Sequence, residues 1–320
     1  MPRRTVTVTR LWATTRRRMD ETQDLSRLGG THDVLHLSRA FFEGIPPQDL
    51  IDHSKERYVA IEHMVPAGRT LLLELAVGTF GDSGPTRDVM TGKTEHTRGR
   101  HHSAATTVRA LVAIPQRATS ALIFLEHAGG NSASWALITP LKLWLRKRFP
   151  DYTWNTETLV ETDAWMEAAQ LTAVSAVLHG HSPNIEDADV PKVVGKLEHV
   201  LTPDGGGKYF PRALWDALHT GKIKRAALFG LEDSDVDDVF VRMEKDGRSK
   251  KFALGYTGSP LAKWVLSDAG DAEPSTETAR DFFFELAPDL FTAVGVDWQS
   301  EDRYGDWPQE VLSLKLEEGS

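Results

Sequence analysis

Short β-prone runs separated by proline and glycine turns dominate the first 125 residues of the chain. Every residue of Thr5–Thr9 is β-branched, which favours a strand over a helix. Tyr58–Val65 and Thr70–Val77 are similar runs, and the proline–alanine–glycine turn between them predicts a hairpin. Further strands of this kind are expected at Thr106–Ile114 and Ala121–Glu126. These runs predict a sheet of antiparallel strands.

Three helices are predicted beside these strands. Asp33–Phe42 places apolar residues on one side of a helix. Thr139-Pro140 has the residues that suit a helix cap followed by the first helical position. Ser275-Thr276 supplies a capping hydroxyl for a third helix over Glu277–Leu286.

The resulting prediction is an α+β fold with an antiparallel strand-rich N-terminal half that also contains helices and a mixed α/β C-terminal half. Residues 1–150 would form a strand-rich α+β domain. Residues 151–320 would form a mixed α/β domain with an acidic C-terminal segment at 268–320. A single large domain is the alternative, because 320 residues suit one large domain or two modest ones.

Composition excludes several kinds of chemistry. The chain has no cysteine, so it has no disulfides, no cysteine-bound metal and no thiol nucleophile. No apolar run reaches the roughly 20 residues that a membrane helix needs, and the N-terminus lacks the apolar stretch of a secretory signal. We therefore expect a soluble, cytoplasmic protein without a membrane partner.

Charge is distributed unevenly along the chain. Residues 268–320 hold 14 of the 46 acidic residues and 3 of the 37 basic ones, whereas the first 18 residues hold six arginines and no acid. The acidic segment also carries large apolar residues, among them Phe283 and Trp307. We expect it to pack against the rest of the chain and to cover part of a basic surface.

The polar excursion Gly78–Ser103 is long for a loop in a compact domain, which indicates a mobile or functional segment. Its part Lys93–His102 carries Lys93, Arg98 and Arg100 with three histidines and a single acid, Glu95. Such residues bind phosphate oxygens, so we predict a nucleic-acid-binding surface here. Its predicted members are Lys93, Arg98 and Arg100 with Arg16, Arg17 and Arg18 of the N-terminal segment, and His101 and His102 are its candidate acid–base catalysts. The alternative is a solvated loop.

A histidine pair is the best candidate for a metal site. His179 and His181 follow an apolar run, and residues two apart share one face of a strand, so both imidazoles could reach one divalent metal. Asp187 lies just downstream as an oxygen ligand. The alternative is a pair of surface or hydrogen-bonded histidines.

Other motifs are incomplete. Gly92-Lys93-Thr94 resembles the end of a phosphate-binding loop, but Arg87 stands where that loop needs its first glycine. Asp233, Asp235 and Asp237 resemble a calcium loop, but Asp238 occupies the position that is normally glycine. The sequence has neither a serine nucleophile elbow nor a dinucleotide fingerprint.

Two functional hypotheses follow. The first is a nucleic-acid-associated protein, which as a metal-dependent phosphodiester hydrolase would use His179, His181 and Asp187 for the metal and His101 or His102 as acid or base. The second is a non-catalytic protein-interaction module whose acidic C-terminal segment is a docking tail.

Overall fold

A computed structural model of the chain describes residues 2–16, 18–159, 169–181, 195–232, 236, 238–245, 248–254 and 260–316. The chain divides into two units. Unit 1 comprises Met1–Leu159 and Leu266–Ser320, and unit 2 comprises Val160–Val265. Each is described by itself below.

β1 (Arg4–Thr15) has a paired strand on each side in unit 1, and buried residues alternate with half-buried ones along much of it. It pairs in antiparallel fashion with β9 (Ala121–Ala128) and with β11 (Tyr152–Leu159). The β1–β9 register sets Val8 opposite Phe124 and Val6 opposite Glu126. These side chains therefore share one face of the sheet.

The remaining strands of unit 1 extend the same antiparallel sheet. From β9 the order runs through β8 (Ala104–Ala113), β5 (Thr70–Thr79) and β4 (Arg57–Ala67) to β3 (Ile51–Asp52). Two short strands, β2 (Arg18–Thr22) and β10 (Asn131–Ser132), pair with β1 and β9.

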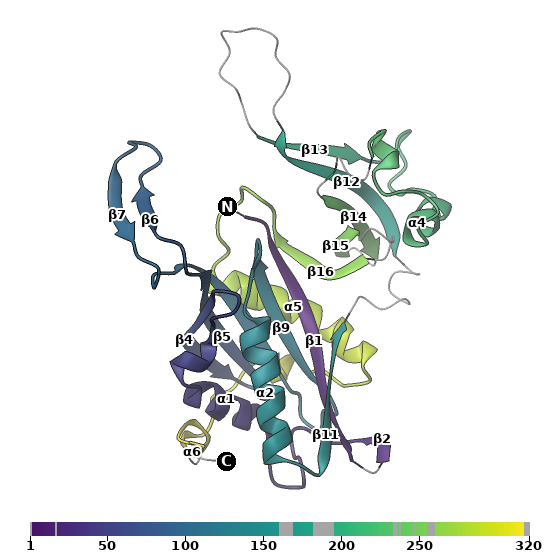
Figure 1. Ribbon diagram of the computed structural model, residues 1–320. Coiled ribbons are helices and arrows are strands. Elements are labelled where there is room, and N and C mark those ends of the chain that lie inside the picture. The colour runs from purple at the N-terminus through teal and green to yellow at the C-terminus, as the bar shows by residue number, and fades with distance from the viewer. Residues whose placement is uncertain are drawn as a thin grey trace. The chain divides into compact units, whose positions relative to one another are not determined.

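Helices cover both faces of this sheet (Figure 1). α1 (Val34–Gly44) and α2 (Ser134–Arg148) lie on one face. Asp33 is the N-cap of α1, and the short 3-10 turn Pro47–Leu50 follows this helix in the chain. α5 (Thr276–Ala293) lies on the other, where Phe283 packs 5.7 Å from Phe124 between ring centroids. None of the described helices is both long and apolar enough to cross a membrane.

A buried ion cluster lies under the start of α5. Glu126 is 1% exposed, and its carboxylate accepts hydrogen bonds from the Arg4 guanidinium at 2.6 Å and from the Arg109 backbone N–H at 2.8 Å. Glu273 lies 2.9 Å from Arg4 and 3.6 Å from Arg109. Thr276 of α5 donates a hydrogen bond to Glu74. Because a buried charge is tolerated only when it is paired, this cluster joins four strands to the C-terminal segment.

The acidic C-terminal segment packs into unit 1, as expected from its apolar residues. Phe283 is fully buried and Trp307 nearly so. Asp268 pairs with Arg3, which precedes β1, and Glu273 pairs with Arg4 at its start, so the segment covers part of that basic surface. After α5 come only two short helical turns, Ser300–Arg303 and α6 (Gln309–Leu312).

The strands of unit 2 pair in antiparallel fashion. Their order is β13 (Gly195–Leu201), β12 (Gln170–His181), β14 (Asp238–Lys245), β15 (Arg248–Leu254) and β16 (Pro260–Ser267). α4 (Arg212–His219) and the turn Ala227–Phe229 lie between β13 and β14 in the chain. Val177 of β12 and Phe240 of β14 pack together in the core of unit 2.

The predicted α+β class with a mixed α/β C-terminal half is wrong. The chain is strand-rich, with 40% strand and 25% helix, it has a large antiparallel sheet, and its C-terminal half is mostly helix and irregular chain. A mixed α/β region needs parallel strands joined by crossover helices. The described strand pairs of unit 2 are all antiparallel.

Candidate nucleic-acid interface

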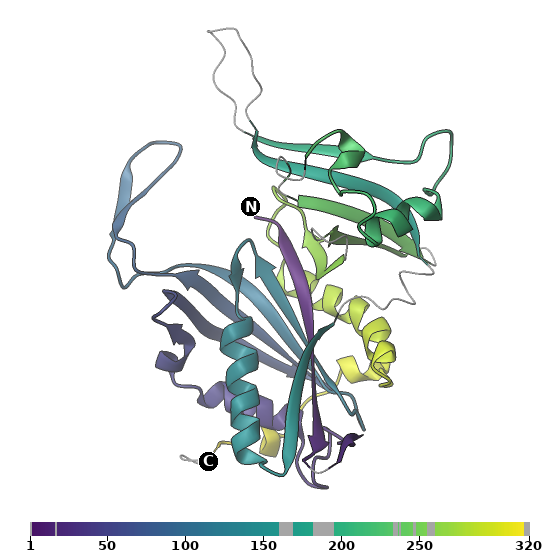
Figure 2. The same ribbon diagram turned by 45° about the vertical axis from the view of Figure 1, so that its right-hand side comes forward.

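The chain between β5 and β8 forms a two-stranded ribbon separate from the main sheet. β6 (Gly84–Arg87) and β7 (Thr94–Arg98) pair with each other in antiparallel fashion, with Thr86 opposite His96 and Gly84 opposite Arg98. Figures 1 and 2 both show this ribbon projecting away from the strands of unit 1. We call Gly84–Arg98 the arm.

Backbone hydrogen bonds hold the end of the arm in a defined turn. The Asp88 carboxylate accepts from the N–H groups of Met90 at 2.7 Å and Thr91 at 2.8 Å. These bonds, that of Thr91 first, lower the pKa of Asp88. Gly92 has a φ of +71° and donates its N–H to the Asp88 carbonyl at 2.8 Å. The turn therefore has a fixed shape that does not depend on packing.

The cations predicted to bind phosphate lie on this arm and at its root. Lys93 follows the turn, Arg98 ends β7, and Arg100 lies where the arm rejoins the sheet. Lys93 and Arg100 are exposed and Arg98 is half-buried. No carboxylate pairs with any of the three within the described ranges. Their charge is thus available to a ligand.

The root of the arm is closed by a hydrogen bond from the Gly81 N–H to the Arg100 carbonyl at 2.9 Å. His102 turns back toward β7, where its ring stacks on that of His96 with centroids 5.4 Å apart and Nδ1 3.4 Å from Nε2 of His96. His101 takes a different direction and lines a pocket next to the root. The two predicted acid–base histidines therefore occupy different surroundings.

This root pocket has a volume of about 420 Å³ and is rich in rings. Its lining residues are Ile51, His53, Tyr58, Phe80, His101 and Ser103. His53 and Phe80 pack edge to face with centroids 5.8 Å apart. The Ser103 hydroxyl is buried and has no hydrogen-bond partner among the described residues. Flat rings beside cations that lack a carboxylate partner are the surroundings in which single-stranded nucleobases stack.

The N-terminal arginines do not join this surface. Arg16 follows β1, and its backbone N–H donates to the Asp151 carbonyl at 3.0 Å. Arg18 begins β2, and Arg17 lies outside the described residues. Both views place β2 at the end of unit 1 opposite the arm. The predicted interface is therefore reduced to the cations of the excursion.

The predicted metal ligands are placed only in part. His179 and His181 end β12 in unit 2, and Asp187 lies outside the described residues. Where the structure describes side chains, no group of three histidine, aspartate or glutamate residues could hold a metal ion. The residue types at 179, 181 and 187 suit a divalent metal, so this site stays a prediction.

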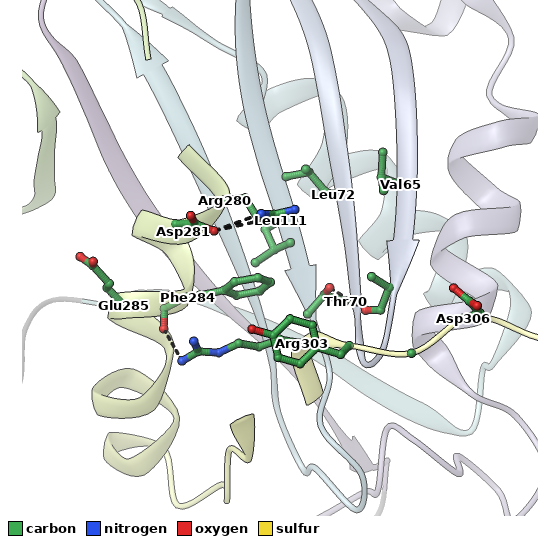
Figure 3. A pocket seen from close by; sticks show the side chains of 13 residues that line it. Val65, Thr70, Leu72, Leu111, Arg280, Asp281, Phe284, Glu285, Arg303 and Asp306 are labelled. Carbon is green, nitrogen blue, oxygen red and sulfur yellow. Dashed lines mark hydrogen bonds and ion pairs between the residues drawn. The ribbon is translucent and has the colours of Figure 1, made fainter. Parts of the chain in front are cut away.

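A second cavity lies between α5 and the strands β4, β5 and β8 (Figure 3). It has a volume of about 460 Å³, and Arg280 and Arg303 both line it. Arg280 lies 3.3 Å from Asp281, while Arg303 stacks on Phe284 and donates to its carbonyl at 3.3 Å. Three carboxylates, Asp281, Glu285 and Asp306, also line this cavity. An acidic lining of this kind disfavours a polyanion, so the arm is the better candidate.

Sequence reasoning missed the rings of the root pocket. Tyr58 lies on β4 and Phe80 just after β5, both before the arm in the chain, and in the sequence they look like ordinary sheet residues. It also missed the exposed pair Val89 and Met90 at the end of the arm, although two adjacent apolar residues inside a polar excursion were a visible signal. Comparison of the chain with protein-family models, with curated proteins and with solved structures finds no match.

Proposed function

We propose that this chain binds nucleic acid through the arm and the cations at its root. The observation that carries the proposal is a free-standing ribbon whose Lys93, Arg98 and Arg100 have no carboxylate partner within the described chain. Arg280, an exposed cation elsewhere in unit 1, lies beside two acids. Lys93, Arg98 and Arg100 differ from it because no carboxylate within the described chain pairs with them.

The shape of the arm suits a nucleic-acid groove. Two-stranded β-ribbons enter the grooves of duplex DNA, either the major or the minor one. Arginine and lysine contacts to the phosphates would fix the ribbon in position. The net charge of -9 does not oppose this, since two of the C-terminal acids, Asp268 and Glu273, pair with Arg3 and Arg4 rather than with the cations of the arm.

The root pocket makes phosphodiester hydrolysis the more specific form of the proposal. His101 lines the pocket beside Arg100 and is the histidine placed to exchange a proton with a bound nucleotide. His102 is less suited, because it is engaged with His96.

Charge reversal on the arm tests the binding. The triple variant Lys93→Glu, Arg98→Glu and Arg100→Glu changes the net charge by the same amount as the control Arg146→Glu, Lys147→Glu and Lys222→Glu, whose cations are exposed and lie off the arm. Binding of a labelled duplex of mixed sequence is followed by fluorescence anisotropy at several salt concentrations.

The arm variant should bind more weakly than the control at every salt concentration. Each phosphate contact that is lost should lower the slope of log affinity against log salt by about 0.9. Equal affinities and slopes for the two triple variants would rule out the arm as the binding surface. Absence of salt-dependent binding by the unmodified protein would rule out the function itself.

A further inference from the structure

The end of the arm exposes two adjacent apolar side chains. Val89 is 94% exposed and Met90 is 90% exposed. The next most exposed large hydrophobic residue of the described chain is Tyr304, at 72%. Isolated apolar side chains are common on protein surfaces. An adjacent pair of almost fully exposed apolar side chains at the end of a projecting ribbon is unusual, because such a pair contributes nothing to the core.

The turn that carries this pair is built from other residues. The Asp88 carboxylate and Gly92 supply its hydrogen bonds and its left-handed position. Valine and methionine side chains are therefore not needed to form it, and polar residues would be favoured there on solubility grounds. The turn presents Val89 and Met90, which we call the tip, at the point farthest along the ribbon.

Cations flank the tip on both strands. Arg87 ends β6, with its guanidinium Nη1 donating to the Gly92 carbonyl at 3.4 Å, and Lys93 follows the turn on the other side. An apolar tip between two cations fits a partner that is anionic outside and apolar inside. Stacked base pairs behind a phosphate backbone have that arrangement.

We infer that Val89 and Met90 enter between neighbouring base pairs of duplex DNA, unstack them and bend the duplex. This inference rests on the proposed nucleic-acid binding by the arm. Apolar side chains, methionine among them, act as such wedges in proteins that bend DNA by about 20–90°. The cations beside the tip would hold the adjacent phosphates while the wedge is in place.

The test uses the full chain and a duplex with 2-aminopurine at successive central positions, flanked by flexible TA and CA steps. Aminopurine fluorescence reports unstacking, and energy transfer between labelled ends reports bending. The variant Val89→Ser with Met90→Ser removes the wedge and keeps Asp88 and Gly92. The matched control Val89→Ile with Met90→Leu keeps an apolar tip.

The unmodified protein and the control should raise aminopurine fluorescence several-fold at one step and bring the duplex ends closer. The serine variant should lose both signals while its salt dependence stays unchanged, because its phosphate contacts remain. Signals that persist in the serine variant would overturn the wedge, as would duplex binding by the unmodified protein without either signal. In both cases the arm would still bind DNA. If the unmodified protein does not bind the duplex, the proposed nucleic-acid binding is wrong, and the inferred insertion of Val89 and Met90 is wrong with it.

Insertion into a lipid surface is the competing outcome. Vesicles of anionic phospholipid are used as the probe in a flotation assay with the same three proteins. Flotation that depends on Val89 and Met90, together with an unperturbed duplex, would overturn the wedge. Absence of flotation together with the fluorescence signals would support it.

Discussion

Trp307 donates its indole Nε1–H to the backbone carbonyl of Gly68 across 2.9 Å, which ties the C-terminal segment to the turn between β4 and β5. Two backbone bonds reinforce this contact. Gly68 donates to the Gly305 carbonyl and Arg69 to the Asp302 carbonyl, each at 2.7 Å. Residues more than 230 positions apart thus form one layer of unit 1.

Gly68→Ala should loosen this contact. Gly68 has a φ of +52°, and an added Cβ would lie 2.6 Å from the Tyr304 carbonyl oxygen and closer still to that of Asp302. We expect a loss of about 2 kcal/mol in the free energy of unfolding, measured by urea denaturation. Gly30→Ala is the control, because Gly30 has a φ of +86° with nothing within 4 Å. It should cost only the backbone strain, about 1 kcal/mol. Equal losses would mean that the close approach to the C-terminal segment has no energetic weight.

The same layer should weaken in mild acid. His36 packs 4.6 Å from Trp307 between ring centroids. Burial lowers the pKa of His36, and the nearby Asp33 carboxylate opposes that shift only in part. The pKa of a histidine in an unfolded chain is about 6.5. At pH values between the lowered pKa of His36 and 6.5, the unfolded chain therefore binds more protons than the folded chain. Stability should be fully present above about pH 6.5 and fall as the pH drops below it.

Urea midpoints at pH 7.5, 6.5 and 5.5 measure this dependence, and His36→Phe should remove part of it. Burial raises the pKa of Asp302, which acts in the opposite sense. That group titrates from about pH 3.8 upward, so the comparison ends at pH 5.5. An identical pH dependence in the phenylalanine variant would exclude His36 as its source.

Glu126→Ala should be strongly destabilising. It would leave the guanidinium of Arg4, which is 2% exposed, without its partner at 2.6 Å. Removing one member of a buried ion pair costs about 3–5 kcal/mol. Glu62→Ala is the control, since Glu62 is exposed on β4, and it should change stability by less than about 0.5 kcal/mol. Chemical denaturation of both variants measures the difference, and a loss below 1 kcal/mol for Glu126→Ala would contradict the assigned role of the cluster.

Local sequence signals predicted the local elements. The turn between Tyr58–Val65 and Thr70–Val77 does join the paired strands β4 and β5. Ser275 does cap α5, accepting a hydrogen bond from the Thr278 N–H. The predicted start of a helix at Thr139-Pro140 is wrong, because α2 begins at Ser134 and contains Pro140 in its interior. Favourable caps mark where a helix can start, but packing against the sheet decides where it does.

Contacts between distant segments could not be predicted in this way. The strands of the arm are polar throughout, so they lack the alternation that identifies a strand. The pairing of Arg4 with Glu126 joins residues 122 positions apart, and only the register of β1 against β9 brings them together. For the site, the cations of the excursion were visible as a charge cluster, whereas the rings of the root pocket come together only in the folded sheet.

Removing the arm should leave unit 1 folded and abolish nucleic-acid binding. The hydrogen bonds of Gly84–Arg98 in the described structure stay within the arm or, from His96, reach His102 at its root. Ser83 and Gly99 lie next to the bond that closes the root, so the two-residue turn Asn-Gly can replace Gly84–Arg98 without strain.

The urea midpoint of this deletion variant should match that of the unmodified protein, with a difference below about 0.5 kcal/mol in stability. Its affinity for a duplex should fall well below that of the unmodified protein, because Lys93, Arg98 and the tip are gone and only Arg100 of the three cations remains. An unfolded deletion variant would show that the arm belongs to the core of unit 1. A folded variant with unchanged affinity would place the binding surface elsewhere on the chain. If the deletion variant keeps the stability of the unmodified protein and loses duplex binding, the arm serves binding and does not stabilise unit 1.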